Sequence, residues 1–191
     1  QSSTSIAKAR FNKNKLNSEI LVISAFFSDE VVEKFLSVNK NNKTKFFFRL
    51  KPKDFIDKSA SFKGLELLIA ENKEVFFTVG IHPNEVLKDE NNSNYDLINN
   101  ISKKNKCVGI GECGLDYHYG KDSINEQKLS FITQINVARD TGLPLIIHSR
   151  DADEDMIDIL TNEFKNGPFQ AILHCFSSGK ELALCGLDLG F

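Results

Sequence analysis

Short, strongly apolar runs alternate along the chain with longer segments whose apolar residues recur at helical spacing. In the short runs successive residues are apolar, whereas a half-exposed strand would alternate apolar and polar residues. Such continuous runs predict strands that are buried on both faces, as in parallel sheets. The predicted strands are KFFFRL from Lys45, VFFTVGI from Val75, CVGIG from Cys107, LPLIIH from Leu143, FQAILH from Phe169 and the closing LDLGF, with EILVISAFF from Glu19 as a further candidate.

The segment that follows Ser123 gives the clearest helix prediction. Ser123 and Glu126 have the spacing of a capping box, in which each side chain bonds a free backbone N–H of the first turn. Gly142 marks the end of the helix, because glycine readily adopts the left-handed conformation that commonly terminates one. The apolar positions between them form the stripe expected to face the core: Ile124, Leu129, Phe131, Ile132, Ile135 and Ala138.

Two further segments predict helices. One begins near Asp151 or Asp153, either of which suits an N-cap, and closes at Gly167. The other opens at Asp29. Strands and helices therefore alternate without a linker of domain length, which predicts one domain of repeated βα units over residues 1–191. Such units build either a doubly wound sheet or a barrel.

The composition is that of an ordinary soluble globular domain. Of the 191 residues, 41% are hydrophobic and 26% are charged, which is unlike a disordered or fibrous chain. The 24 Lys and Arg residues nearly balance the 26 Asp and Glu residues, giving a formal net charge of −2. No overall positive field therefore attracts the protein to nucleic acid or anionic lipid. Any affinity for phosphate must be local or be supplied by a metal ion.

Three features bear on where the protein resides. The four cysteines include no CxxC pair and lie in or beside apolar runs, which suits a reducing compartment such as the cytoplasm. No apolar run approaches the roughly 20 residues that cross a bilayer, so no membrane association is predicted. Residues 1–18 are Ser-rich and basic with no acid, which predicts a flexible terminus. An organelle transit segment has a similar composition and is the alternative interpretation.

Polar residues interrupt the predicted strands at their carboxyl ends. His82 follows VFFTVGI, Glu112 follows CVGIG, His148 follows LPLII and His174 follows FQAIL. In parallel α/β folds, functional sites are assembled on that face. Glu112, His148 and His174 would supply a carboxylate and two imidazoles, which suit Zn²⁺, Mn²⁺ or a related cation that lowers the pKa of a bound water. A histidine after an apolar strand is also commonly a core or loop residue.

The glycines around Glu112 could be taken for a dinucleotide-binding fingerprint. Gly109, Gly111 and Gly114 would then have to open a helix directly, whereas the GLDY that follows predicts a loop. We interpret the glycines as positions where the backbone turns tightly and comes close to a bound ion or ligand.

Four blocks in series resemble the TatD family of metal-dependent deoxyribonucleases, relatives of the amidohydrolases. The blocks are VGIHPNEV, VGIGECGLDYH, LPLIIHSRDADED and AILHCFSSG, and the likeness extends from Thr44 to Phe191. The resemblance implies a TIM-type (β/α)8 barrel that hydrolyses phosphodiester bonds in DNA with two divalent metal ions, Mg²⁺, Mn²⁺ or Zn²⁺. DNA would be the partner, as substrate, and no protein partner is predicted.

The resemblance also implies roles for single residues. Glu112 resembles the family's bridging carboxylate, and His148 and His174 resemble the two imidazoles of one metal subsite. Arg150 matches an arginine that would hold a phosphate oxygen with its forked donors, and a surface ion pair with a neighbouring aspartate is the alternative. His82 matches a histidine at the rim of the site, where it would position substrate or only stabilise a tight turn.

Two parts of the family pattern are missing. No histidine precedes His82, so the usual His-x-His of the first strand is absent, and no TDxP motif of the last strand follows. The predicted barrel is therefore incomplete and of low stability, with one metal subsite complete and the other lacking ligands. The chain is then a partial nuclease, a catalytically impaired relative that acts through binding, or a one-metal hydrolase of another ester or amide.

Overall fold

The computed structural model describes residues 20–23, 45–50, 52, 69–70, 73, 75–88 and 95–191. The predicted helix that opens at Asp29 and the predicted flexible terminus at residues 1–18 lie outside them. The strands are β1 (Ile20–Ile23), β2 (Lys45–Leu50), β3 (Val75–Val79), β4 (Cys107–Asp116), β5 (Leu145–Arg150) and β6 (Ala171–Leu173). The helices are α4 (Tyr95–Ser102), α5 (Ile124–Thr141), α6 (Asp153–Asn166) and α7 (Lys180–Asp188), with 3-10 turns η1 (Pro83–Lys88) and η2 (Lys121–Ser123).

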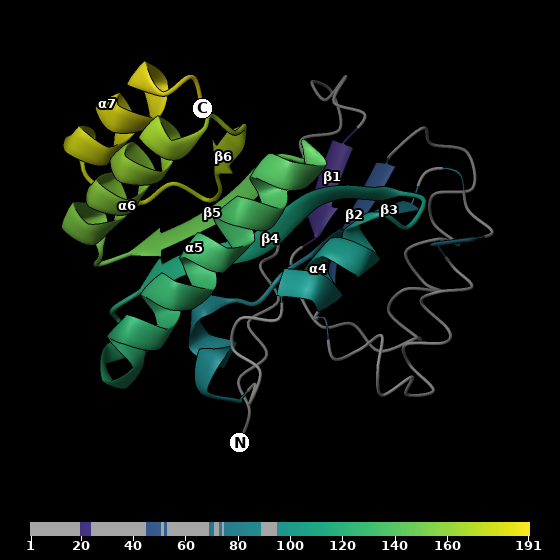
Figure 1. Ribbon diagram of the computed structural model, residues 1–191, viewed down its shortest axis with the longest axis horizontal. Helices are drawn as coiled ribbons and strands as arrows, with labels where there is room; N and C mark the ends of the chain where they lie inside the picture. The colour runs from purple at the N-terminus through teal and green to yellow at the C-terminus, as the bar shows by residue number, and fades with distance from the viewer. Residues whose placement is uncertain are drawn as a thin grey trace, which may run out of the picture.

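The strands form one parallel, 6-stranded sheet in the order β1-β2-β3-β4-β5-β6, which is also their order along the chain (Figure 1). A doubly wound sheet reverses its strand order at one point, whereas a barrel winds in one direction. The observed order therefore decides between the two architectures in favour of barrel-type winding. Within the part of the chain that the structure describes, β1 pairs with β2 alone and β6 with β5 alone, so the barrel is not closed.

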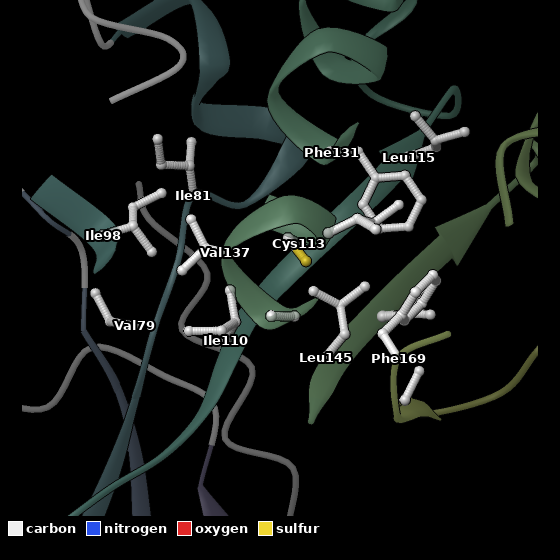
Figure 2. Packing of buried hydrophobic residues seen from close by; sticks show 14 of the residues in the cluster. Val79, Ile81, Ile98, Ile110, Cys113, Leu115, Phe131, Val137, Leu145 and Phe169 are labelled. Atoms are coloured by element: carbon white, nitrogen blue, oxygen red, sulfur yellow. The ribbon is translucent and has the colours of Figure 1, made fainter. Parts of the chain in front are cut away.

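Helix α5 covers the middle of the sheet. It lies along β4, while α4 packs against its side and α6 packs against α7 near β6 (Figure 1). Figure 2 shows Phe131 and Val137 of α5 close to Ile110 and Cys113 of β4, and all four side chains are fully buried. None of the helices in the described ranges is both long and apolar enough to cross a membrane.

The predicted burial of strands on both faces holds for β4 but not for its neighbours. Every residue of β4 from Gly109 to Asp116 is buried. Buried and half-buried residues alternate in β3 and at the start of β5. Strand β4 is thus the central strand of the described core.

The predicted closing strand LDLGF is wrong, because its first residues form the last turn of α7. The buried side of that helix carries Leu182 and Gly186, four positions apart as helical geometry requires, while Leu187 is exposed. The N–H of Leu189 bonds the carbonyl of Cys185 at 3.0 Å. A short apolar run does not distinguish a strand from the end of a helix, so the pattern misled the prediction.

The predicted loop at GLDY is also wrong, because β4 continues to Asp116. Gly114 pairs with His148 and Asp116 pairs with Arg150 on the neighbouring strand. Asp116 is therefore fixed by the sheet and does not lie in a loop.

The helix ends are only partly as predicted. Gly142 ends α5 in the left-handed conformation, with φ 70°, which confirms the predicted stop. Ser123 is the N-cap of α5 but makes no capping hydrogen bond, because its hydroxyl donates into the preceding turn. The N-cap of α6 is Ala152, not Asp151 or Asp153, and the Asp153 carboxylate accepts a backbone N–H just before α7 instead.

Candidate metal centre

Three side chains with metal-binding atoms meet at the carboxyl end of the sheet. His82 follows β3, Glu112 lies in β4 and His148 lies in β5. One ligand atom of each lies within 4.8 Å of the other two, and Glu112 is buried while both histidines are half-buried. Carboxylate oxygen and imidazole nitrogen at such separations suit Zn²⁺ or Mn²⁺. The residue types and spacing therefore fit a divalent cation.

A bulge in β4 directs Glu112 into this cluster. Gly111 pairs with Ile146 and Cys113 pairs with Ile147, so β4 carries one more residue than β5 across this step, and that residue is Glu112. Bulges of this kind redirect a side chain and are common beside active sites. Gly111 has φ 134°, and a Cβ there would lie 2.6 Å from the carbonyl oxygen of Ile146. The glycine thus permits close approach to the next strand. The close approach to an ion or ligand expected from the sequence stays a prediction.

The imidazole of His148 lies between two carboxylates. Its Nδ1 is 3.2 Å from Oε1 of Glu112, and its Nε2 is 3.1 Å from Oδ2 of Asp116. The side chain of Asp116 is only 2% exposed. An imidazole that donates from both nitrogens is in its protonated form. Two carboxylates facing the two ring nitrogens therefore favour the protonated, imidazolium form of His148.

The pKa shifts follow from this arrangement. Burial lowers the pKa of His148, but the hydrogen bonds and charges of Glu112 and Asp116 outweigh it, so the pKa is raised above the ordinary histidine value. Burial raises the pKa of Asp116, but hydrogen bonds from the Tyr119 N–H, the Asn84 amide and His148 outweigh it, so the pKa is lowered. Both shifts favour the charged pair at neutral pH.

His82 stands against His148, with ring centroids 4.6 Å apart and ring planes tilted by 58°. Its Nδ1 accepts the backbone N–H of Asn84 at 3.2 Å. Nδ1 is therefore engaged within the turn, so a contact with an ion or a substrate would be made through Nε2. Substrate positioning by His82 stays a prediction.

His174, the third ligand expected from the sequence, is not among the residues that the structure gathers. Its backbone continues from β6 beside β5, because its N–H bonds the carbonyl oxygen of Ile147 at 2.9 Å. Its Nε2 lies 3.3 Å from Sγ of Cys175. His174 is therefore next to His148 along the sheet, with its imidazole bonded to the neighbouring thiol.

Arg150, expected to hold phosphate, ends β5 and lies over an aromatic ring. Its guanidinium carbon is 4.8 Å from the ring centroid of Tyr119. The two aspartates that were the alternative partners are engaged elsewhere. Asp151 bonds Nδ1 of His118 at 3.0 Å, and Asp153 accepts a backbone N–H at 2.7 Å.

Asp116 is a site residue that the strand pattern did not predict. Its Oδ1 accepts the backbone N–H groups of His118 and Tyr119, at 3.0 and 2.9 Å. Its Oδ2 accepts the side-chain amide of Asn84 at 3.1 Å, in addition to its contact with His148. A signal was present in the sequence, since an acid stands at the end of the same apolar stretch. It was overlooked because the strand was expected to end earlier.

Two buried glutamines of α5 fix the backbone on both sides of the cluster. Gln134 accepts the N–H of Ile81 at 2.9 Å and donates to the carbonyl of the same residue at 3.1 Å. Gln127 does the same for Asp116, at 2.7 and 3.1 Å. The glutamines are seven residues apart, two turns on one helical face, and their exposure is 0–1%. Because buried amides satisfied in this way resist displacement, α5 holds the segments that carry His82 and Asp116 in place.

These observations define a class: singly wound parallel α/β proteins that gather imidazoles and carboxylates at the carboxyl ends of their strands. The family model described as TatD related DNase matches residues 11–191. The chain therefore belongs to the TatD family, which confirms the resemblance found in the sequence.

Curated relatives match the chain over part of their length. The uncharacterized metal-dependent hydrolase YabD of Bacillus subtilis is 36% identical over 124 residues, which are 65% of this chain and 48% of the relative. The 3'-5' ssDNA/RNA exonuclease TatD of Dickeya dadantii is 35% identical over 106 residues, 55% of this chain and 39% of the relative. The chain spans about half the length, or less, of these relatives.

Solved structures match over most of the chain. The crystal structure of YJJV, a TatD homolog from Escherichia coli K12, has a TM-score of 0.70 at 21% identity and covers 90% of this chain and 65% of that one. A hydrolase TatD family protein from Entamoeba histolytica has a TM-score of 0.62 at 24% identity, covering 85% and 54%. At these identities the likeness shows the fold alone. It confirms the predicted α/β fold of the TIM type.

Proposed function

We propose that this protein is a metal-dependent hydrolase. The observation that carries the proposal is the meeting of His82, Glu112 and His148 at the carboxyl ends of three adjacent strands, with ligand atoms within 4.8 Å of one another. Family membership supports it, as does the metal-dependent hydrolase named among the relatives.

The free cysteines support a reducing compartment such as the cytoplasm.

In the proposed site, Glu112 and His148 hold a divalent ion, Mg²⁺, Mn²⁺ or Zn²⁺. His174 is proposed as a third ligand, because its backbone lies beside β5 at the same edge of the sheet. His82 and Arg150 are proposed to bind substrate, Arg150 through its N–H donors. The resemblance to the family implies a second ion, which these residues alone do not account for.

The chemistry follows from this assignment. A divalent ion supplies a bound water that is acidic enough to act as a nucleophile near neutral pH. Asp116 accepts from Nε2 of His148 and so leaves Nδ1 facing Glu112, which is the usual way a carboxylate orients a metal-binding imidazole.

The proposed substrate is a phosphodiester bond of DNA. The Dickeya dadantii relative is named a 3'-5' ssDNA/RNA exonuclease, which supports a nucleic acid and favours single strands. The net charge of −2 provides no general attraction to DNA, so phosphate recognition through an ion and a local arginine is consistent with the composition. A one-metal hydrolase of another ester or amide, and a catalytically impaired relative, are the competing functions.

A nuclease assay tests the proposal. The purified chain is incubated with labelled single-stranded DNA and with Mg²⁺, Mn²⁺ or Zn²⁺ in turn. We expect cleavage that requires an ion, stops with EDTA and returns when excess ion is restored. Cleavage of nitrophenyl esters or amides but not of DNA would support the one-metal hydrolase. A folded protein that cleaves nothing at any ion concentration would support the impaired relative.

The affinity for Mn²⁺ or Zn²⁺ is expected to rise with pH by up to about tenfold per unit and to level off above the pKa of His148. Glu112 and Asp116 raise that pKa, so His148 stays protonated up to a higher pH than an ordinary histidine does. An entering ion must displace that proton. Calorimetry in buffers of different ionisation enthalpy measures both the affinity and the released proton.

Asp116→Asn provides the comparison for this titration. It removes one of the charges that raise the pKa of His148, so the affinity should level off at a lower pH. Affinity that is constant between about pH 6 and 8, with no proton released, would contradict coordination by His148.

A further inference from the structure

A large aromatic side chain stands exposed at the rim of the candidate metal centre. Tyr119 is 70% exposed, although it lies only three residues after the end of the buried strand β4. Its backbone is held, because the N–H of Tyr119 donates to Oδ1 of Asp116 at 2.9 Å. Asp116 is the same carboxylate that bonds His148. The ring is therefore carried on a turn that is tied directly to the cluster.

Two side chains hold the ring of Tyr119 in one orientation. The guanidinium carbon of Arg150 lies over the ring, 4.8 Å from its centroid. The ring of His118 is nearly perpendicular to that of Tyr119, with the ring centroids 4.6 Å apart and the ring planes at 88°. His118 is itself fixed by Asp151, whose carboxylate is 3.0 Å from its Nδ1. An exposed ring that is oriented but not buried contributes little to the core. It is better suited to bind a flat ligand.

The residues around the ring indicate the chemistry of that ligand. A tyrosine ring backed by a guanidinium offers a stacking surface to any nucleobase, since stacking needs no net positive field. Arg150 can stack with its plane and still donate from its edge, which allows one residue to serve both a base and the adjacent phosphate. Arg150 lies two residues after His148, so base and phosphodiester would be bound close together.

We propose that Tyr119, supported by Arg150, stacks on an unpaired nucleobase next to the phosphodiester bond held at the cluster of Glu112 and His148. This subsite rests on the proposed nuclease function and makes it more specific. It selects single-stranded nucleic acid, because the bases inside a duplex are already stacked on one another. It also distinguishes a nucleic acid from a simple phosphate diester.

Steady-state cleavage of two matched oligonucleotides tests the subsite. One is a single-stranded DNA oligomer, and the other has the same phosphodiester backbone with abasic residues. Tyr119→Leu should raise KM for the normal oligomer on the order of tenfold, the size of one base–aromatic stack, and leave cleavage of the abasic oligomer unchanged. Tyr119→Phe, which keeps the ring, should behave as the unaltered chain. Equal effects of Tyr119→Leu on both oligomers, or no effect on either, would overturn the proposal.

Binding without cleavage separates the subsite from the catalytic proposal. Fluorescence anisotropy in EDTA compares the same two oligomers, with and without Tyr119→Leu. If the unaltered chain cleaves no DNA with any ion, the nuclease function fails. Preferential loss of binding to the normal oligomer would still establish the subsite. Equal binding of normal and abasic oligomers by the unaltered chain would overturn it.

Discussion

Glu112→Gln is expected to lower metal-dependent hydrolysis by about a thousandfold, which corresponds to roughly 4 kcal/mol of lost transition-state stabilisation. The amide keeps the shape of the carboxylate but removes the charge that faces Nδ1 of His148 at 3.2 Å. It also removes the anionic oxygen that we propose as a metal ligand. Rates at saturating Mn²⁺, together with Mn²⁺ affinity by calorimetry, measure the two losses separately.

The matched control is Glu154→Gln, the same chemical change at an exposed position of α6. It should leave both the rate and the Mn²⁺ affinity unchanged, because a solvated surface carboxylate contributes little. Circular dichroism shows whether each variant remains folded. Full activity of a folded Glu112→Gln protein would place the reacting bond elsewhere and end the assignment of this cluster.

Strand-end reasoning predicted the position of the cluster but not all of its members. Glu112, His148 and His82 were expected at one face because parallel strands end together, and the structure brings these three together. Whether a side chain turns toward its neighbours depends on register and rotamer, which the pattern does not contain. The bulge at Glu112 and the contact of His174 with a thiol are features of that kind.

The buried face of α5 shows a second limit of the pattern. The predicted stripe included Leu129, which is 64% exposed, and passed over Gln127 and Gln134, which are buried. Hydrophobic periodicity assumes that polar residues face water. These two amides are buried because they pair with backbone groups of Ile81, which follows β3, and of Asp116, which ends β4. These partners are in place only once the chain has folded. A helix that supports a site can therefore lack a continuous apolar stripe.

Gly114→Ala is expected to destabilise the fold by about 3–5 kcal/mol, near the upper end for a single substitution. Gly114 has φ 136°, which disfavours any side chain, and a Cβ there would lie 2.0 Å from the carbonyl oxygen of His148. That oxygen belongs to the backbone of β5, so no rotamer change can relieve the overlap. The strands would have to separate at the pair that carries the imidazole. Urea unfolding followed by circular dichroism measures the loss.

Gly142→Ala separates backbone strain from the overlap. Gly142 also has a positive φ, 70°, but no atom lies within 4 Å of where its Cβ would be. It should cost only the roughly 1–2 kcal/mol of a left-handed residue with a side chain. The additional loss of unfolding free energy in Gly114→Ala, compared with Gly142→Ala, then measures how closely β4 approaches β5. Equal losses at both positions would contradict that close approach, and with it the rigid placement of His148 beside Glu112 that the proposed chemistry requires.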